Sequence, residues 1–253
     1  MNLIKTKEEI EKMRAGGRIL ATALHEVAAA VQPGITTSEL NDIAEQALKK
    51  AGARPSFLGY GRGKGNSYPA SLCTSINEAV VHAIPSPDIK LEAGQIIGLD
   101  LGCWYEGLCT DMAITVPVGE ISVSAQKLIK ITEQSLYEGL KQIKSGARLG
   151  DIGQAIQALV EANGFSVVRD LCGHGVGHAV HEDPAIPNFG RAGTGLKLEA
   201  GMTIAIEPMV NMGKARVDFL ADGWTVVTSD KSLSAHFEHT VVVTEQGCEI
   251  LTQ

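Results

Sequence analysis

The sequence lacks a long apolar run, a recognisable leader and a regular cysteine pattern. No window reaches the ~18 consecutive apolar residues that a membrane-spanning helix needs. Residues 1–17 contain neither an apolar core segment nor a small-residue cleavage site, so we do not expect a signal peptide. The five cysteines are scattered and odd in number, which favours free thiols in a reducing cytosol over a disulfide framework. We therefore expect a cytoplasmic protein that does not span a membrane.

The composition is that of an ordinary globular protein. Hydrophobic residues make up 44% of the 253 residues and charged residues 20%. A chain of this length buries roughly three quarters of its unfolded surface, so it can form a core without disulfides. The net charge of −7 argues against a nucleic-acid backbone or an anionic membrane as the main partner.

Turn and capping signals predict four helices separated by strand-like segments. Thr6 and Glu9 form a capping box that begins the first helix, and Thr36 and Glu39 repeat this pattern for the second. The helices are expected over residues 6–32, 36–52, 124–144 and 150–163. The β-branched runs read as strands are QIIGLDLG, MAITVPV, MTIAIEPMV, WTVVT and HTVVVTE.

The chain contains an internal repeat. LEAGQIIGLD, ending at Asp100, is repeated as LEAGMTIAIE, ending at Glu207. We therefore predict one α+β domain over residues 1–253, made of pseudo-symmetric halves (about 1–120 and 121–253) with helices packed on one curved antiparallel sheet. Asp100 and Glu207 would then occupy equivalent strand positions that face a shared cleft.

The segment around Asp100 predicts a β-hairpin with two facing acids. If the turn is centred between Tyr105 and Glu106, Asp100 lies directly opposite Asp111. Opposed side chains have Cβ atoms ~5 Å apart, where like charges destabilise the strand pair. Two aspartates in apolar strands therefore favour a bound cation, although two solvated aspartates on an exposed face remain an alternative.

A glycine-rich segment, CGHGVGHAVHEDP, brings three histidines together in the sequence. Its glycines argue against a helix, since each costs ~1 kcal/mol there. In an extended strand His174 and His178 share one face, whereas His181 lies on the other unless the backbone bends. The cluster favours a functional site over isolated structural histidines, but not all three can be assumed to be ligands.

Two glutamates lie in apolar strand-like runs. Burying Glu207 or Glu238 is costly unless a partner or a metal compensates the charge, although either acid can also end a strand at the surface. Together with two aspartates and one histidine they form an oxygen-rich donor set that suits Mn, Fe(II), Co or Zn. Two such ions ~3.5–4 Å apart activate a water and polarise a carbonyl or phosphoryl oxygen, which indicates a hydrolase.

These segments together resemble the type I methionine aminopeptidases, which have the pita-bread fold of the M24 metallopeptidases. The segments that carry the resemblance are IKTKEEIEKMRAGG, SINEAVVHAIP, LDLGCWYEGLCTDMA, CGHGVGHAVHEDP, IEPMV and DGWTVVTSDKSLSAHFEHT. The resemblance implies removal of the N-terminal methionine from nascent proteins and peptides, with the ribosome as a candidate place of encounter, by a monomer. It also implies two divalent ions held by Asp100, Asp111, His174, Glu207 and Glu238.

The same resemblance assigns roles around the ions. Glu207 would be the general base for a metal-bridged water that attacks the scissile carbonyl. His181 would stabilise the developing oxyanion, and His82 would contact the scissile amide nitrogen. A monovalent cation (Na or K) and a methionine (S1) pocket are also implied. The residues concerned are Asn77, Ala79 and Ser234 for the cation, and Tyr60, Tyr68, Cys73 and Trp224 for the pocket.

The chain departs from the family pattern in a few places. The loop over residues 59–69 is longer and richer in glycine, and it adds Arg62 and Lys64. We interpret it as a surface loop, since it does not fit a phosphate-binding pattern. His178 and His236 also replace residues that are more usual in relatives, and neither is assigned to catalysis.

Two other functions share much of this pattern. Xaa-Pro peptidases of the same fold use the same five ligands, but they usually carry an additional N-terminal domain, whereas here the catalytic fold begins at once. Non-catalytic binding proteins of this fold lose ligands, and this sequence retains all five together with His82 and His181.

Overall fold

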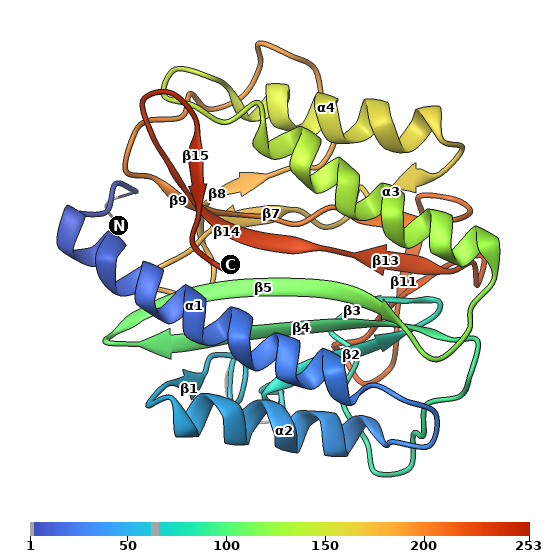
Figure 1. The fold of residues 1–253 in the computed structure, drawn as a ribbon. Helices are drawn as coiled ribbons and strands as arrows, with labels where there is room; N and C mark the ends of the chain where they lie inside the picture. The colour runs from blue at the N-terminus through green and yellow to red at the C-terminus, as the bar shows by residue number, and fades with distance from the viewer. Residues whose placement is uncertain (1–2, 62–65) are drawn as a thin grey trace.

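The computed structural model describes residues 3–61 and 66–253. In this part of the chain, helices pack on a curved antiparallel sheet, which confirms the predicted α+β class (Figure 1). The helices are α1 (Lys7–Ala30), α2 (Thr37–Lys50), α3 (Val123–Leu140) and α4 (Leu149–Ala162). None of the described helices combines the length and the apolar character that a bilayer crossing requires.

One large sheet and two small ones contain the strands. The large sheet has the order β1-β4-β5-β14-β9-β7-β8, with β2 also paired to β4 and β15 to β14; the small sheets are β13-β10-β6 and β11-β12-β3. In chain order the strands are β1 (Arg54–Pro55), β2 (Leu72–Ile76), β3 (Ala79–Val81), β4 (Ile96–Tyr105), β5 (Leu108–Pro117), β6 (Ser166–Val167), β7 (Gly173–Gly175), β8 (Glu182–Ile186), β9 (Thr203–Ile206), β10 (Met209–Asn211), β11 (Val217–Phe219), β12 (Val226–Thr228), β13 (Ser234–His236), β14 (Glu238–Val243) and β15 (Cys248–Ile250).

Both predicted capping boxes are confirmed. The Thr6 hydroxyl accepts a hydrogen bond from the backbone N–H of Glu9, and the Glu9 carboxylate accepts one from the N–H of Thr6. Thr36 and Glu39 repeat the arrangement at α2. Each box satisfies two N–H groups that the helix itself cannot bond, which is why these helix starts were predictable from sequence.

The third helix is shorter than predicted. It ends at Leu140 rather than near residue 144, because the chain tightens into turns in which Gln142 and Ile143 donate to carbonyls three residues back. These turns carry the Ile143 side chain into the core, where it is buried. The preceding Gly139 lets α4 approach closely, since a Cβ there would lie 2.8 Å from Ile156.

The β4–β5 hairpin forms, but its predicted register is wrong. Glu106 and Gly107 make the two-residue turn, with φ of 47° and 83°, so Asp100 pairs with Ala113 and Asp111 with Gly102. The two aspartates are therefore diagonal neighbours on one face rather than directly opposed. A turn of this kind requires positive φ at both central residues, and Glu-Gly is a weaker sequence signal for it than Asn-Gly.

The run MTIAIEPMV, predicted as one strand, is two strands in different sheets. β9 ends at Ile206 and β10 begins at Met209, because Pro208 has no N–H to continue the ladder. Glu207 therefore follows a strand, whereas Asp100 and Asp111 lie inside regular ones. β4 and β9 nevertheless begin at the same position of the repeat, Ile96 and Thr203, and the equivalence of Asp100 and Glu207 stays a prediction.

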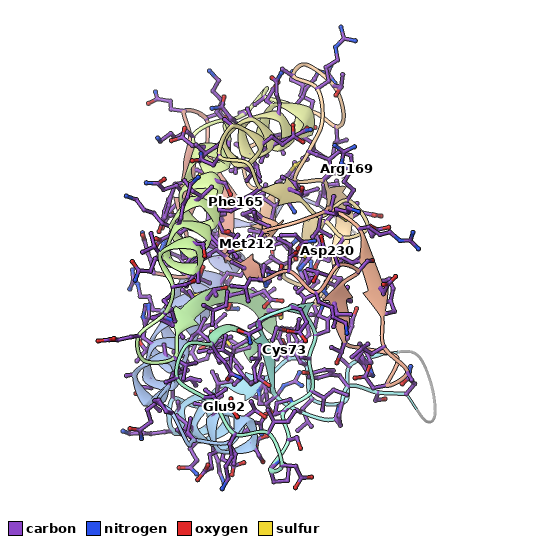
Figure 2. The ribbon with its side chains drawn as sticks, turned by 90° about the vertical axis from the view of Figure 1, so that its right-hand side faces the viewer. Cys73, Glu92, Phe165, Arg169, Met212 and Asp230 are labelled. Atoms are coloured by element: carbon purple, nitrogen blue, oxygen red, sulfur yellow. The ribbon has the colours of Figure 1, made fainter. Side chains whose placement is uncertain are left out.

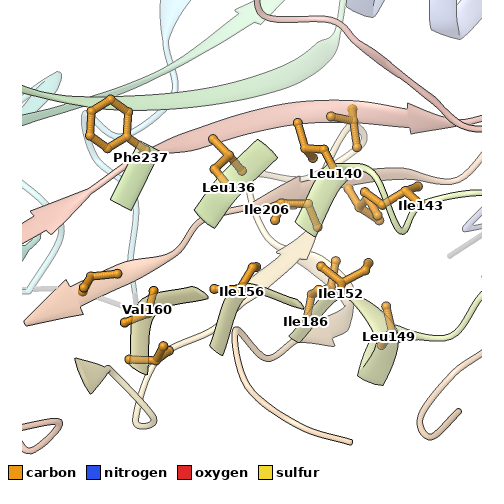
Figure 3. Packing of buried hydrophobic residues seen from close by; sticks show 14 of the residues in the cluster. Leu136, Leu140, Ile143, Leu149, Ile152, Ile156, Val160, Ile186, Ile206 and Phe237 are labelled. Atoms are coloured by element: carbon orange, nitrogen blue, oxygen red, sulfur yellow. The ribbon is translucent and has the colours of Figure 1, made fainter. Parts of the chain in front are cut away.

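Two hydrophobic cores flank the centre of the large sheet. One packs α1 and α2 against β4, with Leu24, Leu40 and Leu99 fully buried. The other packs α3 and α4 against β9 and β14; in Figure 3, Ile152 and Ile156 of α4 lie near Ile206 of β9. Burying one such side chain contributes roughly 1.5–3 kcal/mol to the free energy of folding. The two cores therefore stabilise the strands that lie between them.

Candidate metal centre

Four acidic side chains meet where β4, β5, β14 and β9 lie side by side. Asp100 of β4 and Glu238 of β14 both pair with Ala113 of β5, so the two acids flank one small residue in a single row across the sheet. Asp111 lies two residues from Ala113 and therefore faces the same side. Glu207 follows β9, which is the next strand after β14.

A second row of the sheet places the histidine. Asp111 pairs with Gly102, and its backbone N–H and C=O are both bonded by the Thr240 hydroxyl. Across the following strand, Ala205 pairs with both Thr240 and His174. Gly102 and Ala205 thus lie beside the polar residues of this row and leave room for them on this face.

The His174 ring is oriented toward the acids. Its Nδ1 lies 2.8 Å from the carbonyl oxygen of Gly175, so Nδ1 carries the proton and Nε2 presents a lone pair. Nε2 lies 3.5 Å from Glu207 Oε1 and 3.9 Å from Glu238 Oε1. Ligand atoms of Asp111, His174 and Glu238 all lie within 4.8 Å of one another, a spacing compatible with one shared ion.

The electrostatics of this cluster call for a cation. Burial raises the pKa of Asp100 to about 7, and burial together with the charge of Asp100 raises the pKa of Asp111 well above its usual range. Burial and repulsion between the acids likewise raise the pKa of Glu207 and Glu238. Asp100 Oδ1 and Glu238 Oε1 are buried without a hydrogen-bond partner. Orphaned carboxylate oxygens next to a neutral imidazole fit divalent metal ions.

His236 was not predicted as a site residue, yet the structure places it among the acids. Its Nε2 lies 3.7 Å from Glu207 Oε2 and 4.0 Å from Glu238 Oε2, and it has no hydrogen-bond partner. Burial and the nearby His82 lower its pKa to about 3. One signal was available in the sequence, because His236 is two residues from Glu238 and an extended chain turns both to one face.

The two histidines assigned to the substrate line the cavity at the acids. Burial, and to a lesser extent the charge of His181, lowers the pKa of His82 to about 4. The His181 ring packs edge-on against His174, with centroids 4.3 Å apart. His181 Nδ1 lies 2.5 Å from the Tyr60 hydroxyl, so a residue predicted to line the S1 pocket also contacts the predicted oxyanion donor.

The four predicted S1 residues are brought together in one cavity that the acids also line. Tyr68 packs edge-on against Trp224, with ring centroids 5.2 Å apart, and its hydroxyl donates to the carbonyl oxygens of Leu72 and Ala83. Cys73 lies in the interior, as Figure 2 shows, and burial raises the pKa of its thiol. The cavity lining is Phe57, Tyr60, Tyr68, Cys73, His82, Asp100, Asp111, His174, His181, Glu207, Trp224 and Glu238.

Phe57 is a second lining residue that sequence reasoning missed. It lies edge-on to Tyr68, with centroids 6.4 Å apart. No pattern distinguished it from other apolar residues ahead of the 59–69 loop. Arg62 and Lys64 of that loop lie outside the described residues.

His178 is oriented away from the acids. Its Nε2 lies 2.7 Å from Glu9 Oε1 at the start of α1, and its Nδ1 lies 3.9 Å from Glu182. Glu182 in turn forms a buried ion pair with Lys5 at 2.9 Å. This network ties the N-terminal segment to the chain on either side of His181.

The residues expected to hold a monovalent cation lie partly together. The backbone N–H of Ser234 donates to the carbonyl oxygen of Asn77 over 2.8 Å, and Asn77 has a φ of 53°. Ala79 begins β3, two residues further on. A cation at this position stays a prediction.

A wider groove of about 790 Å³ opens beside the acids. It shares His82, His174, His181 and Glu207 with the narrower cavity described above. The cluster therefore lies between a narrow, mostly aromatic pocket and a broad open groove.

Comparisons with known proteins agree with this arrangement. The chain matches metallopeptidase family M24 over residues 11–245. It is 52% identical to a methionine aminopeptidase of Clostridium perfringens, covering 100% of this chain and 99% of the relative, and 49% identical to methionine aminopeptidase 1 of Bacillus subtilis, covering 100% of both. The crystal structure of a methionine aminopeptidase from Thermotoga maritima superposes with a TM-score of 0.95 at 46% identity, over 99% of this chain and 98% of that one.

A more distant likeness concerns the fold alone. An Xaa-Pro dipeptidase from Bacillus anthracis superposes with a TM-score of 0.76 at 23% identity, over 99% of this chain but 62% of that one. The pita-bread fold predicted from the sequence is confirmed, as is the resemblance to type I methionine aminopeptidases. The buried acids, the full-length match and the shared fold together place the chain in metallopeptidase family M24.

Proposed function

We propose that this protein is a dinuclear-metal aminopeptidase that removes the N-terminal methionine from peptides and nascent proteins. The main observation behind the proposal is that the five candidate metal ligands also line the narrow pocket. A pocket that accepts one side chain beside the reacting centre suits an exopeptidase. The full-length similarity to methionine aminopeptidases supports methionine as that side chain.

Asp100, Asp111, His174, Glu207 and Glu238 would hold the two ions. When bound, two divalent ions supply Lewis-acid polarisation of the scissile carbonyl and lower the pKa of a water between them. Mn, Fe(II), Co and Zn all suit this oxygen-rich set, and availability decides among them in a cell. A Na or K ion near Asn77, Ala79 and Ser234 is part of the same proposal.

Glu207 would handle the proton of the attacking water. Its position after β9, next to Pro208, projects the carboxylate into the cavity instead of into the sheet ladder. Burial and the neighbouring acids raise its pKa, so bound cations are needed to keep the carboxylate ionised and able to accept a proton.

His181 and His82 would contact the peptide bond. In this proposal the Tyr60 hydroxyl, 2.5 Å from His181 Nδ1, would donate to that nitrogen. The proton would then be on Nε2, and Nε2–H would donate to the carbonyl oxygen as negative charge develops. His82 has a φ of 60°, and its neutral ring would face the amide nitrogen of the leaving group.

The pocket chemistry suits a thioether side chain. Tyr68, Trp224 and Phe57 offer aromatic edges and faces, and methionine sulfur contacts aromatic rings favourably by ~0.3–1.5 kcal/mol. An apolar pocket separates side chains that differ by one methylene by only ~1–3 kcal/mol, so slow cleavage after similar residues is expected.

We also propose that residues 1–253 act as one catalytic domain and as a monomer in the cytoplasm. Both halves contribute ligands: Asp100 and Asp111 come from the first, and His174, Glu207 and Glu238 from the second. The pseudo-twofold relation between the halves remains part of this proposal. Nascent chains are the natural substrates, and the ribosome is the candidate place of encounter.

A peptide assay on reconstituted protein tests the function. The chelated protein is reloaded with Mn(II) or Co(II) and offered Met-Ala-Ser, an N-acetylated form of the same peptide and an Xaa-Pro peptide. We expect release of free methionine from Met-Ala-Ser alone, because an aminopeptidase needs a free N-terminus and the aromatic pocket suits a methionine side chain.

The other outcomes identify the competing functions. Cleavage of only the Xaa-Pro peptide would make the protein a proline-specific peptidase. Metal uptake without cleavage of any peptide would indicate a binding protein, and cleavage of the acetylated peptide would contradict an aminopeptidase.

A further inference from the structure

His236 is buried among the acids and has an unused ring nitrogen. Its side chain is 4% exposed, and Nε2 has no hydrogen-bond partner. Buried polar atoms in native proteins almost always have a partner, so an orphaned imidazole nitrogen facing two carboxylates requires an explanation. Ligand atoms of Glu207, His236 and Glu238 lie within 4.8 Å of one another.

The two imidazoles lie on different sides of the same pair of glutamates. His174 Nε2 is nearest to the Oε1 atoms of Glu207 and Glu238, at 3.5 and 3.9 Å. His236 Nε2 is nearest to their Oε2 atoms, at 3.7 and 4.0 Å. Each glutamate therefore offers one oxygen to each imidazole, which is the arrangement that two ions sharing bridging carboxylates require.

The distances agree with metal ligation. A nitrogen or oxygen ligand lies ~2.0–2.2 Å from a divalent transition ion, so two ligands of one ion are at most ~4.4 Å apart. All four separations lie inside that limit and beyond ordinary hydrogen-bond length. Space for an ion is therefore present on the His236 side as well as on the His174 side.

The backbone holds His236 in place. The Thr115 hydroxyl donates to the carbonyl oxygen of His236 over 2.8 Å and accepts from its N–H over 2.9 Å. His236 also pairs with Met209 across β10 and β13. A ligand fixed in this way loses little conformational freedom on binding metal.

From this geometry we infer that His236 is a sixth protein ligand, so that each of the two metal positions has its own imidazole. The second position would combine His236 with Glu207 and Glu238, and Asp100, whose Oδ1 is buried without a hydrogen-bond partner, would complete it. This inference rests on the proposed metalloenzyme function. It adds a nitrogen donor to a set that was otherwise oxygen-rich apart from His174, and it shifts the preference of that position toward imidazole-binding ions such as Zn, Fe or Co.

Proton NMR of the Co(II)-loaded protein counts the ligated imidazoles directly. We expect two sets of hyperfine-shifted imidazole ring protons in the unmodified protein and one set in His236→Gln. We also expect the affinity for the second Co(II), measured by calorimetry, to fall by roughly 100-fold or more in both His236→Gln and His236→Ala, beyond the 10–100-fold typical of outer-shell partners. His178→Gln is the matched control, because this nearby histidine bonds Glu9, and it should keep both sets.

Other outcomes separate the inference from the function on which it rests. Two bound ions with a single shifted imidazole set in the unmodified protein would show that His236 only contacts Glu207 from outside, and would overturn the inference while leaving the enzyme intact. His236→Gln with unchanged affinity would do the same. No bound cobalt and no shifted signals would overturn both. The number of shifted imidazole sets in the unmodified protein tests the inference even if a variant fails to fold.

Discussion

The two halves of the chain build their parts of the centre in different ways. The first half places Asp100 and Asp111 inside two regular ten-residue strands joined by a tight turn. The second half places His174, His236 and Glu238 on strands of three to six residues, and Glu207 directly after the four-residue strand β9. Pro208 and a glycine-rich segment interrupt these strands. Regular pairing holds the first set, whereas strand ends and individual hydrogen bonds hold the second.

This difference suits the proposed roles. Asp100 and Asp111 are held by the register of a long hairpin, so their positions are tied to the fold. Glu207, His181 and His236 lie outside or at the ends of ladders, where side chains project into the cavity and the groove. We therefore expect substitutions of Asp100 and Asp111 to act through metal binding, and those of Glu207 and His181 to act on the chemical step as well.

The largest effect is expected from Asp111→Asn. This change removes a ligand charge that the hairpin holds in place, and we expect metal loading to fail and kcat/KM to drop by roughly 1000-fold or more, since two ions contribute several kcal/mol to the barrier. Bound metal per chain and Met-Ala-Ser cleavage measure it. Retained turnover would show that the hairpin does not hold the ions.

In the metal-free protein the buried acids should contribute a loss of stability as pH rises from about 4 toward about 7. The buried histidines oppose this contribution, because burial lowers the pKa of His82 to about 4 and those of His174 and His236 to about 3. The pKa of Asp100 is raised to about 7 in the folded state, and those of Asp111, Glu207 and Glu238 are also raised, so the folded state binds protons that the unfolded state releases. The contribution of these acids to the free energy of unfolding is therefore complete below pH ~4 and is lost as they ionise. Urea midpoints in EDTA, compared between the unmodified protein and Asp100→Asn across this range, isolate the contribution of the acids.

Metal and mutation should each flatten that slope. Bound Mn(II) compensates the acids, and Asp100→Asn removes one of the groups that titrate. A slope unchanged by both would mean that the acids are not the source of the pH dependence.

A smaller effect is expected from Tyr60→Phe, which breaks a contact between the halves. Without the hydroxyl at His181 Nδ1, the ring loses its fixed tautomer, and we expect kcat to fall by roughly 10–100-fold with little change in KM. The pH profile of kcat should shift as well, since His181 would titrate in a changed environment. Phe57→Leu, in the same pocket but without a polar contact, should instead raise KM.

The smallest effect is expected on packing within the second half. In Gly139→Ala the added Cβ meets Ile156 of α4 at 2.8 Å, and overpacking of this kind costs roughly 1–3 kcal/mol of unfolding free energy. Gly247→Ala is the control, because nothing lies within 4 Å of its Cβ, and it should change stability by about 0.5 kcal/mol or less. If Gly139→Ala and Gly247→Ala changed the free energy of unfolding equally in chemical denaturation, the close α3–α4 contact would be contradicted.

Sequence reasoning succeeded where the signal was local. The Thr6 and Thr36 capping boxes each depend on residues within four positions of one another. The acids Asp100 and Asp111 were also found, since charged residues in apolar strands are unusual.

The predictions from sequence were wrong where the result depended on the exact turn position or on contacts between distant residues. A turn displaced by one residue changed the Asp100–Asp111 pairing from opposed to diagonal. The α3 end moved because Ile143 packs into the core, which no local pattern reveals. His236 and Phe57 went unrecognised because their proximity to the site depends on strands that are distant in the sequence.

Counting the ions bound by the protein and by Glu238→Ala tests the central claim most directly, because Glu238 belongs to both groups of candidate ligands. Calorimetric titration of the chelated protein with Mn(II), checked by elemental analysis, should give two ions per unmodified chain. It should give no tightly bound ion for Glu238→Ala, since both positions lose a shared carboxylate. Fewer than two ions in the unmodified chain, or two ions retained by Glu238→Ala, would contradict a two-metal centre built jointly by the two halves.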